Sequence, residues 1–188
     1  MIRSIALIFE NAQPLLAARA RRLVTNLPST VGSPIRVRFV PDLTRHGHGP
    51  IHAGSLLRKR RILLETSLAS DPAEFDRILV HELFHFAWLR LGNQRRRSYE
   101  QLLANEFVAH ARGELGWSAE WRKDALGPSD RRLRTRRWRE YACESFCDSA
   151  AWLFAGIGRH PEFTLKARFR PGRRRWFREL AATGGISL

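Results

Sequence analysis

The stretch that decides the fold is His81-Glu82-Leu83-Phe84-His85, which lies inside a long apolar segment. On an α-helix, residues four apart lie on the same face, so both imidazoles can reach one metal ion. The glutamate that follows the first histidine can reach a water molecule on that metal and act as its base. The motif therefore predicts a helical metal site with His81 and His85 as ligands and Glu82 as the catalytic residue.

The sequence around this motif predicts one helix over residues 71–92. Asp71 is expected as the N-cap and Pro72 as the first helical residue, with Glu74 completing a capping box. Gly92 is expected to end the helix. Apolar residues recur at helical spacing and predict a buried face formed by Phe75, Ile78, Leu79, Phe86 and Leu89.

The N-terminal part predicts a small sheet and one covering helix. Residues 14–27 predict a basic amphipathic helix, and residues 35–39 alternate apolar and basic side chains as a strand does. Residues 53–57 and 61–65 predict two strand segments or one continuous strand, and a strand just before the motif helix could pair with an extended peptide. The Gly- and His-rich residues 45–52 predict a flexible loop, with metal binding as the alternative.

Helices dominate the prediction for the C-terminal part. Residues 95–97 are expected as a turn, and residues 163–169 as a strand or a broken helix. The helices expected after the motif cover residues 98–112, 117–126, 138–156 and 173–180.

Together these elements predict an α+β fold. A small mixed or antiparallel sheet would pack on the motif helix, and a helical part would follow it. The length of 188 residues suits a single domain. Its expected parts are residues 1–70 (helix and sheet), 71–92 (active-site helix), 98–156 (helical part with the third metal ligand) and 160–188 (basic tail).

The chain is strongly basic. Lys+Arg 33 against Asp+Glu 18 gives a net charge of +15, and the excess gathers at residues 58–61, 95–97, 131–139 and 168–178. Such clusters suit a nucleic acid or an acidic protein partner, although no standard nucleic-acid-binding motif is present and solvated faces are the alternative. The residues expected to bind anions are Arg131, Arg132, Arg134, Arg136, Arg137, Arg173, Arg174 and Arg175.

The two cysteines and the apolar runs predict a cytoplasmic protein. Cys143 and Cys147 would share a helix face, where they are poorly placed for a disulfide, so we expect core packing in a reducing compartment. No apolar run is long enough to span a membrane, and residues 1–20 are expected to be part of the fold. The oligomeric state cannot be predicted.

A catalytic zinc site needs a third protein ligand. The metzincin extension is absent, because Trp88 and Leu91 stand where a glycine and a histidine would be required. A downstream carboxylate is therefore expected, and the main candidates are Glu100, Glu106, Glu114 and Glu144. Glu144 is preferred because Asp148 lies four residues later, where a second carboxylate can hold the far nitrogen of a ligating histidine.

With His81–His85 and Glu144–Asp148, the chain resembles the gluzincins, a class of zinc metallopeptidases, and in its size the compact minigluzincins. The resemblance implies a zincin-like fold, Zn²⁺ as cofactor and a peptide or protein substrate. It also implies metal ligation by His81, His85 and Glu144, with Glu82 as general base and Asp148 as the partner of His81. The asparagine that often precedes the third ligand is Cys143 here.

The function expected is hydrolysis of peptide bonds by a zinc-activated water with Glu82 as the base. Tyr99, His110 and Tyr141 are candidate donors to the oxyanion. One alternative is a SprT-like protease acting near DNA, with His110 as third ligand. Another is an ImmA/IrrE-like regulatory protease with Glu106 in that role. The last is a zincin-fold binding protein without activity that uses its basic clusters.

Overall fold

The N-terminal half is built on a four-stranded sheet with strand order β1-β3-β7-β6. The computed structural model describes residues 5–11, 13–45, 49–50 and 52–188. The strands are β1 (Leu7–Glu10), β3 (Ile35–Val40), β7 (Arg61–Glu65) and β6 (Ala53–Leu56). The first three run parallel, and β6 pairs antiparallel with β7 at the edge. The sheet is therefore small and mixed, as predicted.

The free edge beside the motif helix is β6, not the strand that directly precedes that helix. A 3-10 turn at Leu57–Lys59 and a left-handed Arg60 (φ 47°) reverse the chain between β6 and β7. The alternative of one continuous strand is therefore wrong. Of the predicted loop, residues 46–48 and 51 lie outside the described part of the chain, while β4 (Thr44–Arg45) and β5 (Gly49–Pro50) form a short antiparallel pair beside them.

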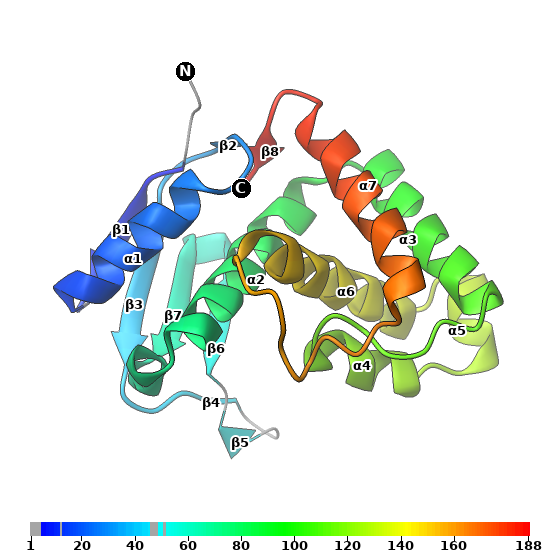
Figure 1. Cartoon of the computed structure of the whole chain (residues 1–188), viewed down its shortest axis with the longest axis horizontal. Coiled ribbons are helices and arrows are strands. Elements are labelled where there is room, and N and C mark those ends of the chain that lie inside the picture. The colour runs from blue at the N-terminus through cyan, green and yellow to red at the C-terminus, as the bar shows by residue number, and fades with distance from the viewer. Residues whose placement is uncertain (1–4, 12, 46–48, 51) are drawn as a thin grey trace.

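Helices α1 (Pro14–Thr25) and α2 (Pro72–Arg90) lie on the same side of this sheet (Figure 1). The alternation in β3 produces the core under them, because its apolar side chains are buried while the arginines between them are exposed. The buried side chains of β3 are Ile35, Val37 and Phe39.

Helix α2 begins as predicted and ends differently. The Asp71 side chain accepts hydrogen bonds from the amides of Ala73 (3.1 Å) and Glu74 (3.0 Å). Glu74 does not complete a capping box, because its carboxylate binds Arg77 instead. Gly92 has φ −62° and is the N-cap of the next helix, so it is not the left-handed stop that was expected.

The C-terminal half is helical. Its helices are α3 (Asn93–Val108), α4 (Trp117–Asp124), α5 (Pro128–Leu133), α6 (Arg136–Phe154) and α7 (Arg170–Ala181). Residues 95–97 lie inside α3 and form no turn, and α7 begins earlier than predicted. Residues 163–169 form no strand; a 3-10 turn at Ala167–Phe169 leads into α7. A short parallel pair of β2 (Thr30–Val31) and β8 (Ile186–Ser187) returns the chain to the N-terminal half.

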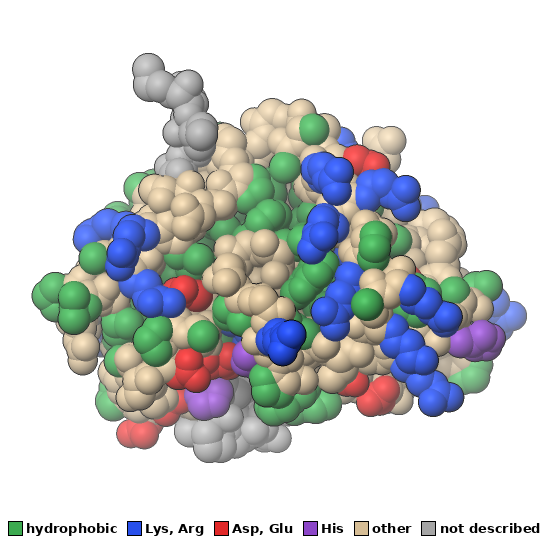
Figure 2. All heavy atoms as spheres, viewed as in Figure 1, with side chains coloured by type: hydrophobic (Ala, Val, Ile, Leu, Met, Phe, Trp, Pro, Cys, Tyr) green, Lys and Arg blue, Asp and Glu red, His purple; other side chains and the backbone are tan. Residues whose placement is uncertain are grey.

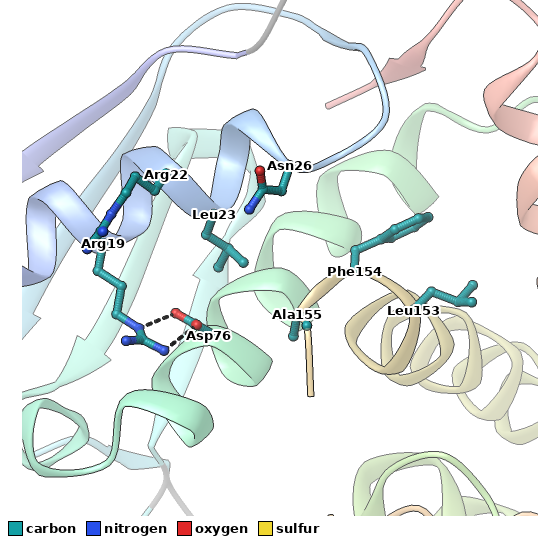
Figure 3. A pocket seen from close by; sticks show the side chains of 9 residues that line it. Arg19, Arg22, Leu23, Asn26, Asp76, Leu153, Phe154 and Ala155 are labelled. Carbon is teal, nitrogen blue, oxygen red and sulfur yellow. Dashed lines mark hydrogen bonds and ion pairs between the residues drawn. The ribbon is translucent and has the colours of Figure 1, made fainter. Parts of the chain in front are cut away.

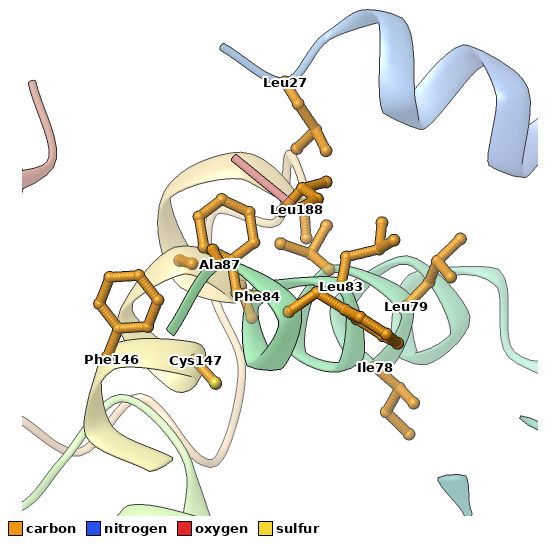
Figure 4. Close-up of a cluster of buried hydrophobic side chains, with 14 of the residues drawn as sticks. Leu27, Ile78, Leu79, Leu83, Phe84, Ala87, Phe146, Cys147 and Leu188 are labelled. Atoms are coloured by element: carbon orange, nitrogen blue, oxygen red, sulfur yellow. The ribbon is translucent and has the colours of Figure 1, made fainter. Parts of the chain in front are cut away.

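The main core lies where α2 crosses α6. Phe84 of α2 packs on Phe146 of α6, with 5.8 Å between ring centroids, and both rings contact Phe177 of α7. Figure 4 shows Phe84 and Phe146 in this core, with Leu188 beside Leu83 of α2. The prediction for Leu89 is wrong, because it is 50% exposed. α2 is otherwise covered on nearly all sides, which explains its almost continuous apolar sequence.

Basic side chains spread over the outer surface of the helical half (Figure 2). Residues 131, 132, 136, 137, 174 and 175 are exposed there. Across the described residues, every helix is too short or too polar to cross a membrane.

Candidate metal centre

Two histidine rings converge where α2 meets α6. The Nε2 atoms of His81 and His85 are 3.1 Å apart, and the rings meet edge to face. One helical turn separates the two residues, so both point from the same face of α2. His81 is 8% exposed and His85 is half-buried. An ion between the two nitrogens would therefore be largely shielded from bulk water.

Asp148 of α6 fixes the ring of His81 from the far side. Its Oδ1 accepts a hydrogen bond from Nδ1 of His81 at 2.7 Å. Because a carboxylate only accepts, the proton lies on Nδ1, and in the neutral ring the lone pair of Nε2 faces His85. The contact expected between these two residues is present.

Asp148 also joins α4 to α6. Its Oδ2 accepts a hydrogen bond from the amide of Ala119 at 3.0 Å, in the first turn of α4. The backbone of Gly116 passes so close that a Cβ there would lie 2.2 Å from Cγ of Asp148. Glycine is therefore required at position 116 by close approach, since its φ of 178° is open to any residue.

Glu144 lies next to His81 on the open side of the centre. Its Oε2 is 3.4 Å from Nε2 of His81, and its Oε1 is 3.5 Å from Nη2 of Arg122. Burial raises the pKa of Glu144, but His81, His85 and Arg122 outweigh it and bring this pKa to about 2. Burial lowers the pKa of His81, but Asp148 and Glu144 outweigh it and raise that pKa well above the usual value. The cluster attracts positive charge, which a proton or a metal cation can supply.

The distances from Nε2 of His81 to His85 and to Glu144 suit zinc. The possible ligand atoms that all lie within 4.8 Å of one another belong to His81, His85 and Cys147, and Glu144 is not part of that group. Bonds of about 2.0–2.1 Å around a tetrahedral ion put neighbouring nitrogen or oxygen ligands about 3.3 Å apart. The two Nε2 atoms are 3.1 Å apart, and His81 and Glu144 are separated by 3.4 Å. Lone pairs that face each other at this distance repel unless a proton or cation lies between them. Two imidazoles and a carboxylate are also the donor set of many catalytic zinc sites.

Both cysteines lie at this centre, which the sequence prediction missed. One ligand atom each from His81, His85 and Cys147 lies within 4.8 Å of the other two. Sγ of Cys143 is 3.6 Å from Nδ1 of His85. The expected core packing is confirmed, because Cys147 belongs to the hydrophobic core and Cys143 packs against it. The signal was present in the sequence, because Cys147 lies three residues after Glu144, on a neighbouring row of the same helix.

Glu82 points to the edge strand of the sheet. Its Oε2 accepts a hydrogen bond from Oγ of Ser55 in β6 at 2.5 Å, and its backbone carbonyl lies 3.0 Å from the same hydroxyl. Within the described part of the chain, Oε1 of Glu82 makes no hydrogen bond. One oxygen is thus held by the sheet, and the other is available to a reacting group. The sequence analysis did not predict the hydrogen bond from Ser55 to Glu82.

The other candidate third ligands are engaged elsewhere. Both oxygens of Glu106 bind the guanidinium of Arg173, at 2.8 and 2.6 Å. Those of Glu100 bind Arg134 at 2.5 and 2.7 Å. Glu114 is fully buried and accepts a hydrogen bond from Tyr141. These contacts leave Glu144 as the carboxylate of this set that lies beside His81.

The predicted oxyanion donors lie outside the centre. The hydroxyl of Tyr99 donates to the carbonyl of Ser145 at 2.9 Å, and that of Tyr141 donates to Glu114 at 2.5 Å. Both tyrosines are buried, so the expectation for them is corrected. His110 is exposed and left-handed (φ 53°) just beyond α3, and no described contact links it to His81 or His85.

The prediction that Arg173 binds an anion is also wrong, because its side chain is completely buried and cannot reach an external anion. It pairs with Glu106 and Glu114, and it also donates to Ser145 and Ser149 of α6. Arg134 and Arg136 also have carboxylate partners, in Glu100 and Glu140.

A polar cluster that the sequence analysis did not identify lies one turn before His81 on α2. Arg77 binds Glu74 at 2.5 Å and Glu162 at 2.8 Å, and His160 contacts Glu74 at 3.2 Å. Arg77 offsets one of the two carboxylate charges, and this network ties the segment after α6 to α2. Glu74, His160 and Glu162 also form a second group of possible ligand atoms within 4.8 Å of one another.

A surface cavity of about 400 Å³ lies between α1, α2 and the end of α6 (Figure 3). Arg19 binds Asp76 there through two hydrogen bonds, at 2.7 and 2.6 Å. None of its lining residues belongs to the metal centre.

Comparison with known proteins gives no relative. No protein-family model matches the chain, and no curated protein or solved structure gives a significant match. The site therefore has to be interpreted from its own chemistry.

Proposed function

We propose that this protein is a zinc-dependent metallopeptidase with a gluzincin-like site. His81, His85 and Glu144 would hold the metal, and Glu82 would be the general base. The observation that carries the proposal is the approach of two imidazole Nε2 atoms to 3.1 Å, with the tautomer of one ring fixed by Asp148. A buried pair of this kind, with a carboxylate beside it, favours a proton or a metal cation between its nitrogens, and we propose the metal.

Bound zinc supplies Lewis acidity, which lowers the pKa of water and polarises a carbonyl group. Glu82 accepts a proton at Oε1 and passes it to the leaving amine of the cleaved peptide. Ser55 holds the other oxygen of Glu82, so the carboxylate keeps one orientation through both transfers.

The position of the edge strand β6 is an argument that the substrate is a peptide. Among the described strands, β7 pairs with one side of β6 and none pairs with the other, and Ser55 brings β6 next to the base. An extended peptide that pairs with β6 would run past Glu82 with its backbone carbonyls in line.

The test is the substitution Glu82→Gln, with purified protein loaded with zinc. We expect the metal content to stay unchanged and cleavage of a denatured protein substrate to fall by about 10²- to 10⁴-fold. Glu140→Gln is the matched control, because Glu140 is exposed on α6 and pairs with Arg136. Full activity of Glu82→Gln, or a wild type that binds no zinc, would rule the proposal out.

A second candidate is a binding function of the basic surface. The exposed arginines of the helical half, among them six of the eight that were predicted to bind anions, favour a nucleic acid or an acidic protein as partner. Binding of duplex DNA that weakens steeply with salt, in a protein that cleaves no denatured substrate, would favour this function.

A further inference from the structure

We propose that Cys147 is a fourth protein ligand of the metal, so that the resting site is closed and hydrolysis requires the thiolate to leave. The ligation stands on geometry alone, whereas the gating of hydrolysis rests on the proposed function.

The position of Cys147 carries the ligation. Its Sγ belongs to one of two groups of three possible ligand atoms, found among the described residues, that lie within 4.8 Å of one another, and its partners in that group are His81 and His85. Its side chain is fully buried at the contact between α6 and α2 (Figure 4). A tetrahedral zinc ion with a sulfur ligand at about 2.3 Å places that sulfur about 3.6 Å from its nitrogen ligands. The separations between Sγ and the two imidazoles, which are at most 4.8 Å, would therefore contract to about 3.6 Å when the ion binds.

Helix α6 presents the carboxylate and the thiol together. Glu144 and Cys147 are three residues apart, so their side chains leave neighbouring rows of one helix face. Asp148 occupies the next row and is used behind His81, where it makes the hydrogen bond to Nδ1. One turn of α6 thus supplies a carboxylate ligand, a thiol and the support of a histidine.

The coordination chemistry explains the closed state. The thiol loses its proton to solvent as the metal–sulfur bond forms. The two imidazoles, the thiolate and the Glu144 carboxylate beside His81 would together occupy four positions on the metal. Four-ligand sites of this kind are structural because no position remains for water. Breaking the metal–sulfur bond, with return of the proton to sulfur, opens the position that hydrolysis needs.

X-ray absorption at the zinc edge tests the ligation without any assay of activity. For the zinc-loaded wild type we expect one sulfur scatterer at about 2.3 Å, beside nitrogen and oxygen at about 2.0–2.1 Å. Cys147→Ser should lose the sulfur scatterer, and Cys143→Ser should keep it. A wild-type spectrum without sulfur, or sulfur that persists in Cys147→Ser, overturns the proposal.

Hydrolysis by the zinc-loaded variants tests the gate. Cys147→Ala should raise kcat several-fold over the wild type, whereas Cys143→Ser should not. Retained zinc with an unchanged or lower kcat in Cys147→Ala overturns the gating. If Glu82→Gln shows that the protein is no peptidase, the absorption result still decides whether Cys147 is a ligand.

Discussion

At the level of single residues, Asp148 has two structural roles at the centre. It orients the ring of His81 through one oxygen and caps the first turn of α4 through the other. Outer hydrogen-bond partners of this kind keep a ligand in the tautomer that binds metal, and they increase its basicity.

Asp148→Asn is therefore expected to weaken zinc binding by about 10- to 100-fold. The amide can still accept a bond from Ala119, but it has lost the negative charge that faces Nδ1 of His81. Competition with a chromogenic chelator measures the affinity. Asp124→Asn, on the exposed end of α4, is the control. An unchanged affinity would show that Asp148 serves only to cap α4.

At the scale of elements, the centre depends on how closely the start of α4 approaches α6. Gly116 is the N-cap of α4, and nothing larger fits against the Asp148 carboxylate. The groups of the site thus lie on three helices, α2, α4 and α6. The Asp148 side chain limits how closely the start of α4 can approach α6.

Gly116→Ala should lower both zinc affinity and thermal stability, because the added methyl group displaces the Asp148 carboxylate from His81. A cost of about 1–3 kcal/mol is typical of such overpacking. Gly158→Ala is the matched control, since a Cβ there meets nothing within 4 Å. Calorimetry of apo and zinc-loaded protein separates the two effects, and equal behaviour of both variants would contradict this account.

The sequence predicted elements better than the way they pair. The cap at Asp71 and the helix that carries Glu144 follow local rules, and both are present. The tail at residues 163–169 was ambiguous because its alternation is short, and it forms no strand. The positions of Ser55 and Cys147 depend on contacts between distant segments, which local pattern does not encode. Tyr99 and Tyr141 were attractive donors by type, yet folding buries their hydroxyls in the Arg173 network.

At the scale of the whole molecule, a buried charge network holds the helical half together. Arg173 of α7 is surrounded by Glu106, Glu114 and hydroxyl groups of α3 and α6. Burial raises the pKa of Glu114, but Arg173 and Lys123 outweigh it and keep this pKa below the usual value.

This network makes the fold sensitive to acid. Glu114 stays ionised in the folded protein at a pH where the unfolded chain, with a glutamate pKa of about 4.3, has taken up a proton. Its stabilisation is therefore complete above that pH and is lost as the pH falls through the lower folded pKa. Urea unfolding should show a free energy that decreases below about pH 4.3. In Glu114→Gln this decrease should be shallower, by as much as about 1.4 kcal/mol per pH unit.

Glu140→Gln is the control for this pH dependence, because its carboxylate is partly exposed and pairs with an exposed arginine. It should reproduce the wild-type slope. Equal slopes for Glu114→Gln and the wild type would assign the acid sensitivity to other carboxylates.

The distance along the chain between the two halves of the centre also has a consequence for synthesis. His81 and Asp148 are 67 positions apart, and His85 and Cys143 are 58 apart. While the ribosome is still making the helical half, the emerging chain offers a metal only the two imidazoles of α2. In the proposed zinc site, tight capture of the metal would therefore wait until α6 has left the exit tunnel and docked. A chain that ends before residue 144 would then hold the metal only weakly.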